Sequence, residues 1–314
     1  MSKQLAIIPD DQHDRRRYIG GSDVAAVLGI SPWRTPLQLW EAKTALELPS
    51  DGPQTGVKRR GQRWEGVVAE MLVEHLQAQG HTVEIVGAGR RYVDPELPFL
   101  AAEIDFEIRL DGEDEITNVE LKTVHPFKSA EWGEAGTDEA PVWYVAQGMH
   151  GVGVTRRRKC LIAPLFGADE IRAFPVLRDD VTIEAMRARC VAFWELVTTG
   201  VRPDPTTLAD LDRLYQGDKQ APALWADNEL HRHWLRLRAI KAEIKARERE
   251  GEAIEFDLKR AMRDAVEMRT EDMCAVTWKP HETSRFDLES FKKDHPALAK
   301  QYTSKTTARP FIVK

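Results

Sequence analysis

The feature that most constrains the fold is a series of three strand-like segments enclosed between two helices. Apolar residues recur at helical spacing over residues 58–80 and again over 140–154. Between these helices, the sequence predicts one or two strands over residues 81–94 and single strands over 99–114 and 116–125. The dipeptide Asp111-Gly112 predicts a hairpin between the last two strands. This order predicts an α/β (α+β) fold, in which a mixed central β-sheet is flanked by helices.

Further elements are predicted on both sides of this series: a short helix within residues 19–33 that ends at a glycine, a second helix over 35–45, strands over 157–166 and 170–177, and a long helix over 180–200. Ser22 or Asp23 can cap the first short helix. The Pro-rich stretch 201–207 is the clearest boundary. We therefore predict one domain over residues 1–205 and a C-terminal extension over 206–314.

The C-terminal extension is predicted to be mainly helical, with a small β part. Its apolar residues approximate a heptad that is interrupted near Gly251. This pattern fits either a helical hairpin or one long broken helix. Residues 273–279 and 309–314 are predicted to be strands, with a helix over 288–302 between them.

The composition indicates a globular protein of a reducing compartment. The chain has 314 residues, and no segment approaches the roughly 20 consecutive apolar residues that a membrane helix requires. The first residues lack the apolar core of a signal peptide. Three scattered cysteines, Cys160, Cys190 and Cys274, supply neither a disulfide framework nor the four ligands of an iron–sulfur cluster. We expect a cytoplasmic protein without a membrane partner. The net charge of −6 does not by itself indicate a nucleic-acid partner.

Glu120 and Lys122 are separated by one residue inside a predicted strand. Alternate strand residues share a face, so these two side chains point the same way. One interpretation is a solvated ion pair at the sheet edge, which contributes little to stability. The other is an active-site pair, in which the carboxylate holds a metal ion and the ammonium orients water or stabilises charge on a phosphate.

Three further polar residues favour the second interpretation. Asp105 lies on the preceding strand, near the same end as Glu120, while Glu65 and Gln147 lie on the two enclosing helices. Two carboxylates, a backbone carbonyl and waters are suitable ligands for Mg²⁺, which polarises a phosphodiester and lowers the pKa of bound water. The sequence therefore predicts a metal-dependent phosphodiesterase site with these catalytic residues: Glu65, Asp105, Glu120, Lys122 and Gln147.

The order of several short motifs resembles a known family. The motifs GSD, GISPW, RGQRWE, ID, ELK and YVAQ follow one another within residues 15–203. This set is similar to that of the YqaJ viral recombinase family, relatives of phage lambda exonuclease in the PD-(D/E)XK nuclease superfamily. The ordered set is more specific than ELK alone. It implies a restriction-endonuclease-like core.

The resemblance also implies roles for the residues of the metal site. Asp105 and Glu120 match the metal ligands, with the Leu121 backbone carbonyl as a third ligand and Glu65 in support, directly or through water. Lys122 matches the catalytic lysine. Family members often place Ser-Pro before the aspartate and Gly after it. This chain has Ile104 and Phe106 there, and Glu103 is a further candidate ligand.

A second group of residues matches positions that contact DNA. Ser22, with an arginine among Arg15, Arg16 and Arg17, falls where the family holds the 5′-phosphate of DNA. A hydroxyl and a guanidinium at a helix N-terminus suit a phosphate. Gln147, with Tyr144 nearby, matches the glutamine on the helix beside the metal site.

The resemblance implies a Mg²⁺-dependent 5′→3′ exonuclease, with Mn²⁺ as a substitute, that acts on double-stranded DNA ends and leaves a 3′ single strand. The setting would be a phage or prophage, with a RecT-like annealing protein as partner and a ring trimer as one assembly. Two alternatives stay open: a structure- or site-specific endonuclease, and a non-catalytic DNA-binding recombination module. The C-terminal extension would serve oligomerisation, DNA contact or partner docking, or would only pack on the nuclease core.

Overall fold

The computed structural model describes residues 6–7, 14–46, 54–218, 220–271, 273–305 and 308–314. The side chains of residues 6, 7, 54, 55, 57–60 and 62 lie outside this description. The chain divides into two compact units, residues 1–214 and 215–314, and each is described by itself. In the described ranges, every helix is too short or too polar to cross a membrane.

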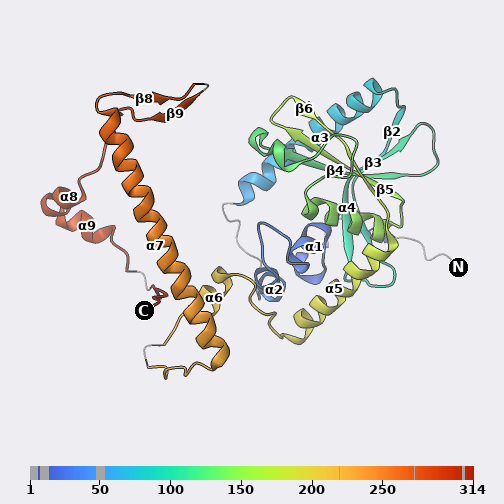
Figure 1. Cartoon of the computed structure of the whole chain (residues 1–314). Coiled ribbons are helices and arrows are strands. Elements are labelled where there is room, and N and C mark those ends of the chain that lie inside the picture. The colour runs from blue at the N-terminus through green and yellow to red at the C-terminus, as the bar shows by residue number, and fades with distance from the viewer. Residues whose placement is uncertain (1–5, 8–13, 47–53, 219, 272, 306–307) are drawn as a thin grey trace. The chain divides into compact units, whose positions relative to one another are not determined.

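The first unit is built on one mixed β-sheet (Figure 1). The described strands lie in the order β1-β2-β3-β4-β5-β6, and β7 also pairs with β5. Neighbouring strands are antiparallel except β4 and β5, which run parallel because helix α4 carries the chain back between them. The strands are β1 (Ala6–Ile7), β2 (Val83–Val93), β3 (Ala101–Leu110), β4 (Thr117–Val124), β5 (Lys159–Phe166), β6 (Glu170–Ile171) and β7 (Phe174–Leu177).

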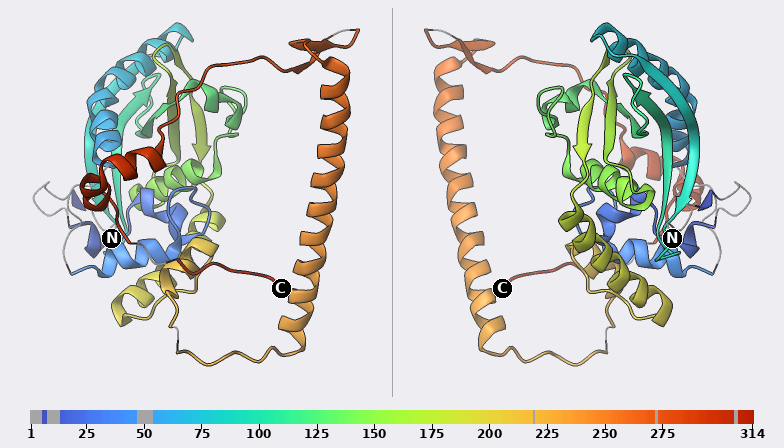
Figure 2. Two further views of the ribbon diagram at one scale, coloured as in Figure 1. Left: turned by 90° about the vertical axis from the view of Figure 1, so that its left-hand side faces the viewer. Right: turned by 90° about the vertical axis from the view of Figure 1, so that its right-hand side faces the viewer.

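Helices cover both faces of this sheet (Figure 2). On one face, α3 packs Val68 and Leu72 against Val119 and Leu121 of β4. On the other face, α1, α4 and α5 form the larger core cluster with β5 and β7. The helices are α1 (Gly21–Val27), α2 (Pro36–Thr44), α3 (Gln54–Ala78), α4 (Val142–Thr155), α5 (Asp180–Thr199) and α6 (Leu208–Leu214), with short 3₁₀ turns at Arg15–Arg17 and Pro126–Glu131.

The predicted mixed α/β fold is confirmed. The order α3-β2-β3-β4-α4-β5 is the helix–strand–hairpin–helix pattern on which the family resemblance rested. The turn after β3 is also as predicted, because Asp111 and Gly112 both have positive φ and the Glu113 N–H donates to the Leu110 carbonyl. The predicted strand over 170–177 is instead split into β6 and β7. The break lies opposite Pro164 of β5, which has no N–H to donate to the ladder.

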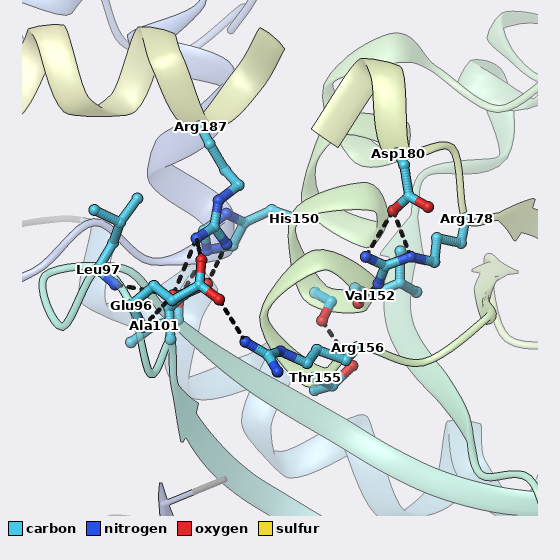
Figure 3. A network of polar contacts seen from close by, with 12 residues as sticks. Glu96, Leu97, Ala101, His150, Val152, Thr155, Arg156, Arg178, Asp180 and Arg187 are labelled. Carbon is cyan, nitrogen blue, oxygen red and sulfur yellow. Dashed lines mark hydrogen bonds and ion pairs between the residues drawn. The ribbon is translucent and has the colours of Figure 1, made fainter. Parts of the chain in front are cut away.

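A polar network fixes α4 and α5 against the start of β3 (Figure 3). Arg187 of α5 binds the carboxylates of Asp94 and Glu96, which lie between β2 and β3. His150 of α4 contacts the Ala101 carbonyl through Nε2 at 2.9 Å. Arg156, just after α4, donates to Glu96 at 2.8 Å. These contacts hold the strand that carries Asp105 in register with the helix that carries Gln147.

The second unit contains one long helix, a hairpin and two short helices. These are α7 (Asn228–Met262), β8 (Glu267–Arg269), β9 (Cys274–Thr277), α8 (Leu288–Asp294) and α9 (Pro296–Gln301). Helix α7 continues through Gly251, so both the helical hairpin and the broken helix are wrong. A single glycine costs about 1 kcal/mol in a helix, and the strong helix formers around it, with the Arg247–Glu250 ion pair, offset that cost.

Two other predictions for this unit need correction. The strand predicted over 273–279 exists as β9, but its partner is β8, and residues 309–314 form no strand. The predicted helix over 288–302 is two helices. The break is at His295, which precedes Pro296. A proline ring sterically disfavours the helical conformation in the residue before it.

Candidate active site

Strands β3 and β4 separate at the point where the predicted acids lie. Their regular pairing ends where Phe106 faces Val119. Asp105 is the next residue of β3, and its Oδ2 accepts a hydrogen bond from the Leu121 backbone N–H at 2.8 Å. The N–H and C=O of one strand residue point toward the same neighbouring strand. The Leu121 carbonyl therefore faces the same gap as the Asp105 carboxylate.

Glu120 and Lys122 share the face of β4 that α4 covers. Gln147 of α4 donates from Nε2 to Glu120 Oε2 at 2.6 Å, and Lys122 Nζ donates to the same oxygen at 3.0 Å. Lys122 Nζ also lies 5.6 Å from the centre of the Tyr144 ring. Glu120 is only 2% exposed, which excludes a solvated ion pair at the sheet edge. The alternation of side chains predicted from the strand is therefore present, and it brings Gln147 to the same carboxylate.

Several acids lie close to the single ammonium of Lys122, and the pKa values of these acids are raised. Burial, together with the charges of Asp105 and Glu103, raises the pKa of Glu120 to about 7 against the opposing effect of Lys122. Burial also raises the pKa of Asp105, and burial with the same neighbouring acids raises the pKa of Glu65 on α3. Burial disfavours the charged Lys122, but the carboxylates outweigh it and raise the Lys122 pKa. The site thus has an excess of negative charge.

A cavity of about 80 Å³ adjoins these acids. Its walls include polar and charged side chains from α1, α4, β2, β3 and the turn before α1: Arg15, Ser22, Arg91, Glu103, Asp105 and Gln147. Arg15 Nη2 donates to Ser22 Oγ at 2.8 Å, so two of the residues predicted to hold a phosphate are in direct contact. The structure therefore brings the predicted phosphate residues and the predicted metal residues to one place.

The glycine-rich turn before α1 explains how this cavity is built. A Cβ on Gly21 would lie 3.1 Å from Gln147 Cγ, so glycine allows α1 to approach α4 closely. The N-cap of α1 is Gly20, so neither Ser22 nor Asp23 is the cap residue that was predicted. Asp23 lies one turn inside the helix, and its carboxylate accepts the Gly20 N–H at 3.1 Å. The same carboxylate is buried against Lys43 Nζ at 2.7 Å. The Ser22 hydroxyl is left to contact Arg15.

The structure separates other members of the predicted DNA-binding group. Arg16 forms an ion pair with Asp14 and donates to backbone carbonyls at the end of α2, and Arg17 is exposed outside the cavity walls. Tyr144 stacks on Trp132 with ring centres 5.4 Å apart, so it supports Lys122 and does not line the cavity.

Sequence reasoning missed Arg91 as a site residue. It lies on β2 opposite Glu103 of β3 and lines the cavity. The signal was the pair Arg90-Arg91 inside a predicted strand. Adjacent strand residues point to opposite faces, so one of two consecutive arginines must point toward the packed interior. The Asp23–Lys43 pair, which is buried under Arg15, was also missed.

The comparisons with known proteins are consistent with the motifs. Residues 12–158 match the YqaJ-like viral recombinase domain. The chain is 29% identical over 311 residues to uncharacterized protein YqaJ of Bacillus subtilis (strain 168), which covers 96% of this chain and 92% of that protein. This likeness extends through the C-terminal unit.

Solved structures with a related fold include two of one enzyme. An alkaline exonuclease from Laribacter hongkongensis, LHK-Exo, is 16% identical with a TM-score of 0.45 and covers 64% of this chain and 94% of that chain. LHK-Exo in complex with dAMP is 16% identical with a TM-score of 0.46 and covers 66% of this chain and 97% of that chain. The match of residues 12–158 to the family model, on the segment that carries the motifs, shows that the chain has a YqaJ-like viral recombinase domain there.

Proposed function

We propose that this protein is a metal-dependent deoxyribonuclease that degrades double-stranded DNA ends 5′→3′ and leaves 3′ single strands for phage-type recombination. The observation that supports this most is the adjacency of two groups. Glu120, Lys122 and Gln147 form a hydrogen-bonded acid–base group, and Arg15 with Ser22 lines a cavity that Gln147 and Asp105 also line. Removal of a nucleotide from a 5′ terminus needs a hydrolytic centre beside an anion site.

The residues present fit Mg²⁺, with Mn²⁺ as a substitute. Among the described residues, no three His, Cys, Asp or Glu side chains form a metal-binding cluster. Mg²⁺ requires only one or two carboxylates because it keeps several waters. Asp105 and Glu120 would hold it with the Leu121 carbonyl, and Glu65 or Glu103 would act through water. The bound ion would polarise the phosphodiester and lower the pKa of water.

The remaining side chains have roles of their own in the proposed reaction. The Lys122 ammonium, held by Glu120 at 3.0 Å, would orient the attacking water or stabilise charge that develops on the phosphate. Gln147 fixes the orientation of the Glu120 carboxylate, and the Leu121 N–H fixes that of Asp105. Arg15 and Ser22 would bind the terminal 5′-phosphate and so set the polarity of digestion.

The proposed setting is a phage or prophage in a bacterial cytoplasm. A RecT-like single-strand annealing protein is the proposed partner, because it would cover the 3′ strand that the nuclease exposes. A ring trimer around DNA is one proposed assembly. The C-terminal unit lies outside residues 12–158, and we propose that it provides the surface for one of these contacts.

The test uses linear duplex labelled at its 5′ ends. We expect the full chain to release the label in Mg²⁺ and to release none when EDTA removes the metal, while covalently closed circular duplex stays intact. Cutting of the circle would instead identify an endonuclease. Tight DNA binding with no cleavage in Mg²⁺ or Mn²⁺ would support a non-catalytic recombination module.

A second prediction concerns Ser22→Ala. Loss of the hydroxyl removes one hydrogen-bond donor from the proposed phosphate site, and a bond of this kind contributes about 1 kcal/mol. We expect the preference for 5′-phosphorylated over 5′-hydroxyl ends, measured as a ratio of kcat/KM values, to fall roughly fivefold. Ser31→Ala, in the loop after α1, is the control and should keep the wild-type ratio. An unchanged ratio in Ser22→Ala would remove the hydroxyl from the phosphate site.

A further inference from the structure

Arg91 is a buried cation that lacks hydrogen-bond partners for most of its guanidinium. Arg91 is 7% exposed, and its Nε and Nη1 atoms are buried with no hydrogen-bond partner among the described residues. Arginine is almost never buried unless it is paired, because an uncompensated charge inside a protein is costly. Its neighbour Arg90 is an ordinary case, since it donates to Glu107 at 2.9 Å. An external anion would therefore supply the hydrogen-bond acceptors and the negative charge that Arg91 lacks.

The surroundings of Arg91 hold its charge in place beside the cavity. Its guanidinium carbon lies 3.9 Å from the centre of the buried Tyr18 ring. Two more cations, Arg15 and Lys43, lie 5.3 Å and 5.5 Å from the same ring. Asp23 contacts both of those cations, at 3.2 Å and 2.7 Å. Of the three cations around Tyr18, Arg91 is thus the one that this carboxylate does not reach.

We propose that Arg91 binds the terminal 5′-phosphate of DNA together with Arg15 and Ser22, and that it contributes more than Ser22 to the preference for phosphorylated ends. The inference rests on the proposed exonuclease function and deepens it. A terminal phosphate carries a charge of about −1.5 to −2 and three acceptor oxygens, which match a guanidinium fork. A 5′-hydroxyl cannot neutralise Arg91, so binding of such an end leaves the buried charge unpaired.

Glu103 provides an internal contrast. It lies opposite Arg91 in the sheet register, lines the same cavity and is exposed. If Arg91 serves the phosphate, removing the Glu103 charge should make the cavity more favourable to an anion. If Arg91 serves only to balance Glu103, the two neutral variants should behave alike.

The experiment compares kcat/KM on 5′-phosphorylated and 5′-hydroxyl duplexes for the full chain in Mg²⁺. We expect Arg91→Gln to lower the ratio by about tenfold or more, which is the effect of losing one charge-assisted hydrogen bond. Arg91→Lys should retain part of the ratio, because it keeps the charge and loses the planar fork. Glu103→Gln should keep or raise the ratio. Arg109→Gln is the matched control, since Arg109 pairs with Glu84 on the sheet surface.

The inference would be overturned if Arg91→Gln kept the wild-type ratio of kcat/KM values. It would also be overturned if Glu103→Gln or Arg109→Gln lowered this ratio as much as Arg91→Gln does. The ratio cancels any general loss of folded protein, and Arg91→Lys replaces Arg91→Gln if the latter does not fold. A second measurement does not need cleavage: inorganic phosphate should raise the thermal midpoint of the wild-type chain, compared with chloride at equal ionic strength, and should raise that of the Arg91 variant less. If the wild type cuts no DNA, the proposed function fails and this shift alone decides the inference. A wild type that phosphate does not stabilise overturns it.

Discussion

Lys122→Ala is expected to reduce release of the 5′ label by roughly 10²–10³-fold, the usual effect of removing one preorganised group that stabilises transition-state charge. Lys122 contacts Glu120 Oε2 at 3.0 Å, and its charge lowers the pKa of Asp105 against the effect of burial. DNA end binding should persist, because the Arg15 and Ser22 group is not touched by the change. The measurement is single-turnover label release in Mg²⁺, with end binding measured separately in EDTA.

The matched control for this prediction is Lys128→Ala. Lys128 lies on the 3₁₀ turn after β4 and pairs with Glu131 while 62% of its side chain is exposed. The Lys128→Ala variant should cut DNA at the wild-type rate. Since Lys122 also neutralises buried carboxylates, the thermal midpoint of each variant is compared with that of the wild type. A folded Lys122→Ala protein that still cuts DNA at full rate would remove this lysine from the mechanism.

Asp23→Asn is expected to destabilise the first unit by about 3–5 kcal/mol. Asp23 is 4% exposed and bonds Lys43, whose side chain is 3% exposed. Neutralising the acid leaves a buried ammonium that keeps only the carbonyls of Arg15 and Tyr18. At about 2–4 °C for each kcal/mol, the thermal midpoint should fall by at least ~6 °C. Asp180→Asn, which breaks an exposed pair with Arg178, should change it little.

The effect of Asp23→Asn should also depend on pH. Burial opposes ionisation of Asp23, but Arg15 and Lys43 outweigh it and hold its pKa below the usual value. An acid with a lowered pKa in the folded state stabilises the fold above its unfolded pKa of about 3.9, and this contribution is lost as the pH falls through the folded value. The gap between wild type and variant should therefore be full at pH 6–8 and shrink below about pH 4. A gap that is small at neutral pH, or that widens in acid, would contradict the role assigned to this pair.

Local sequence patterns predicted much of the site. The one-residue spacing of Glu120 and Lys122 placed both side chains on one face of a strand, and that is where they lie. The family resemblance pointed to Ser22 beside an arginine, and Ser22 does contact Arg15. Such predictions succeed because strand alternation and turn chemistry depend only on neighbours in the chain.

Other features depended on contacts between distant segments. The pattern of three consecutive arginines did not show that Arg16 would donate to the carbonyls of Ala45 and Leu46, about 30 residues away, while Arg15 lines the cavity. The burial of Arg91 follows from the register of β2 against β3 and from the position of Tyr18. Propensities are weak compared with such packing, so these outcomes could not be obtained from the chain pattern.

The sequence by itself determined the order of helices and strands over residues 58–166, the face on which Glu120 and Lys122 lie, and the identity of the acids near them. Periodicity and turn residues are properties of short segments, and a linear pattern records them fully. Only the tertiary structure decided which groups meet. The separation of β3 from β4 opens the gap at Asp105, and the approach of α1 to α4 places Arg15, Ser22 and Arg91 around one cavity. Both depend on close packing between segments that are far apart in the chain, and a pattern within one segment does not record such contacts.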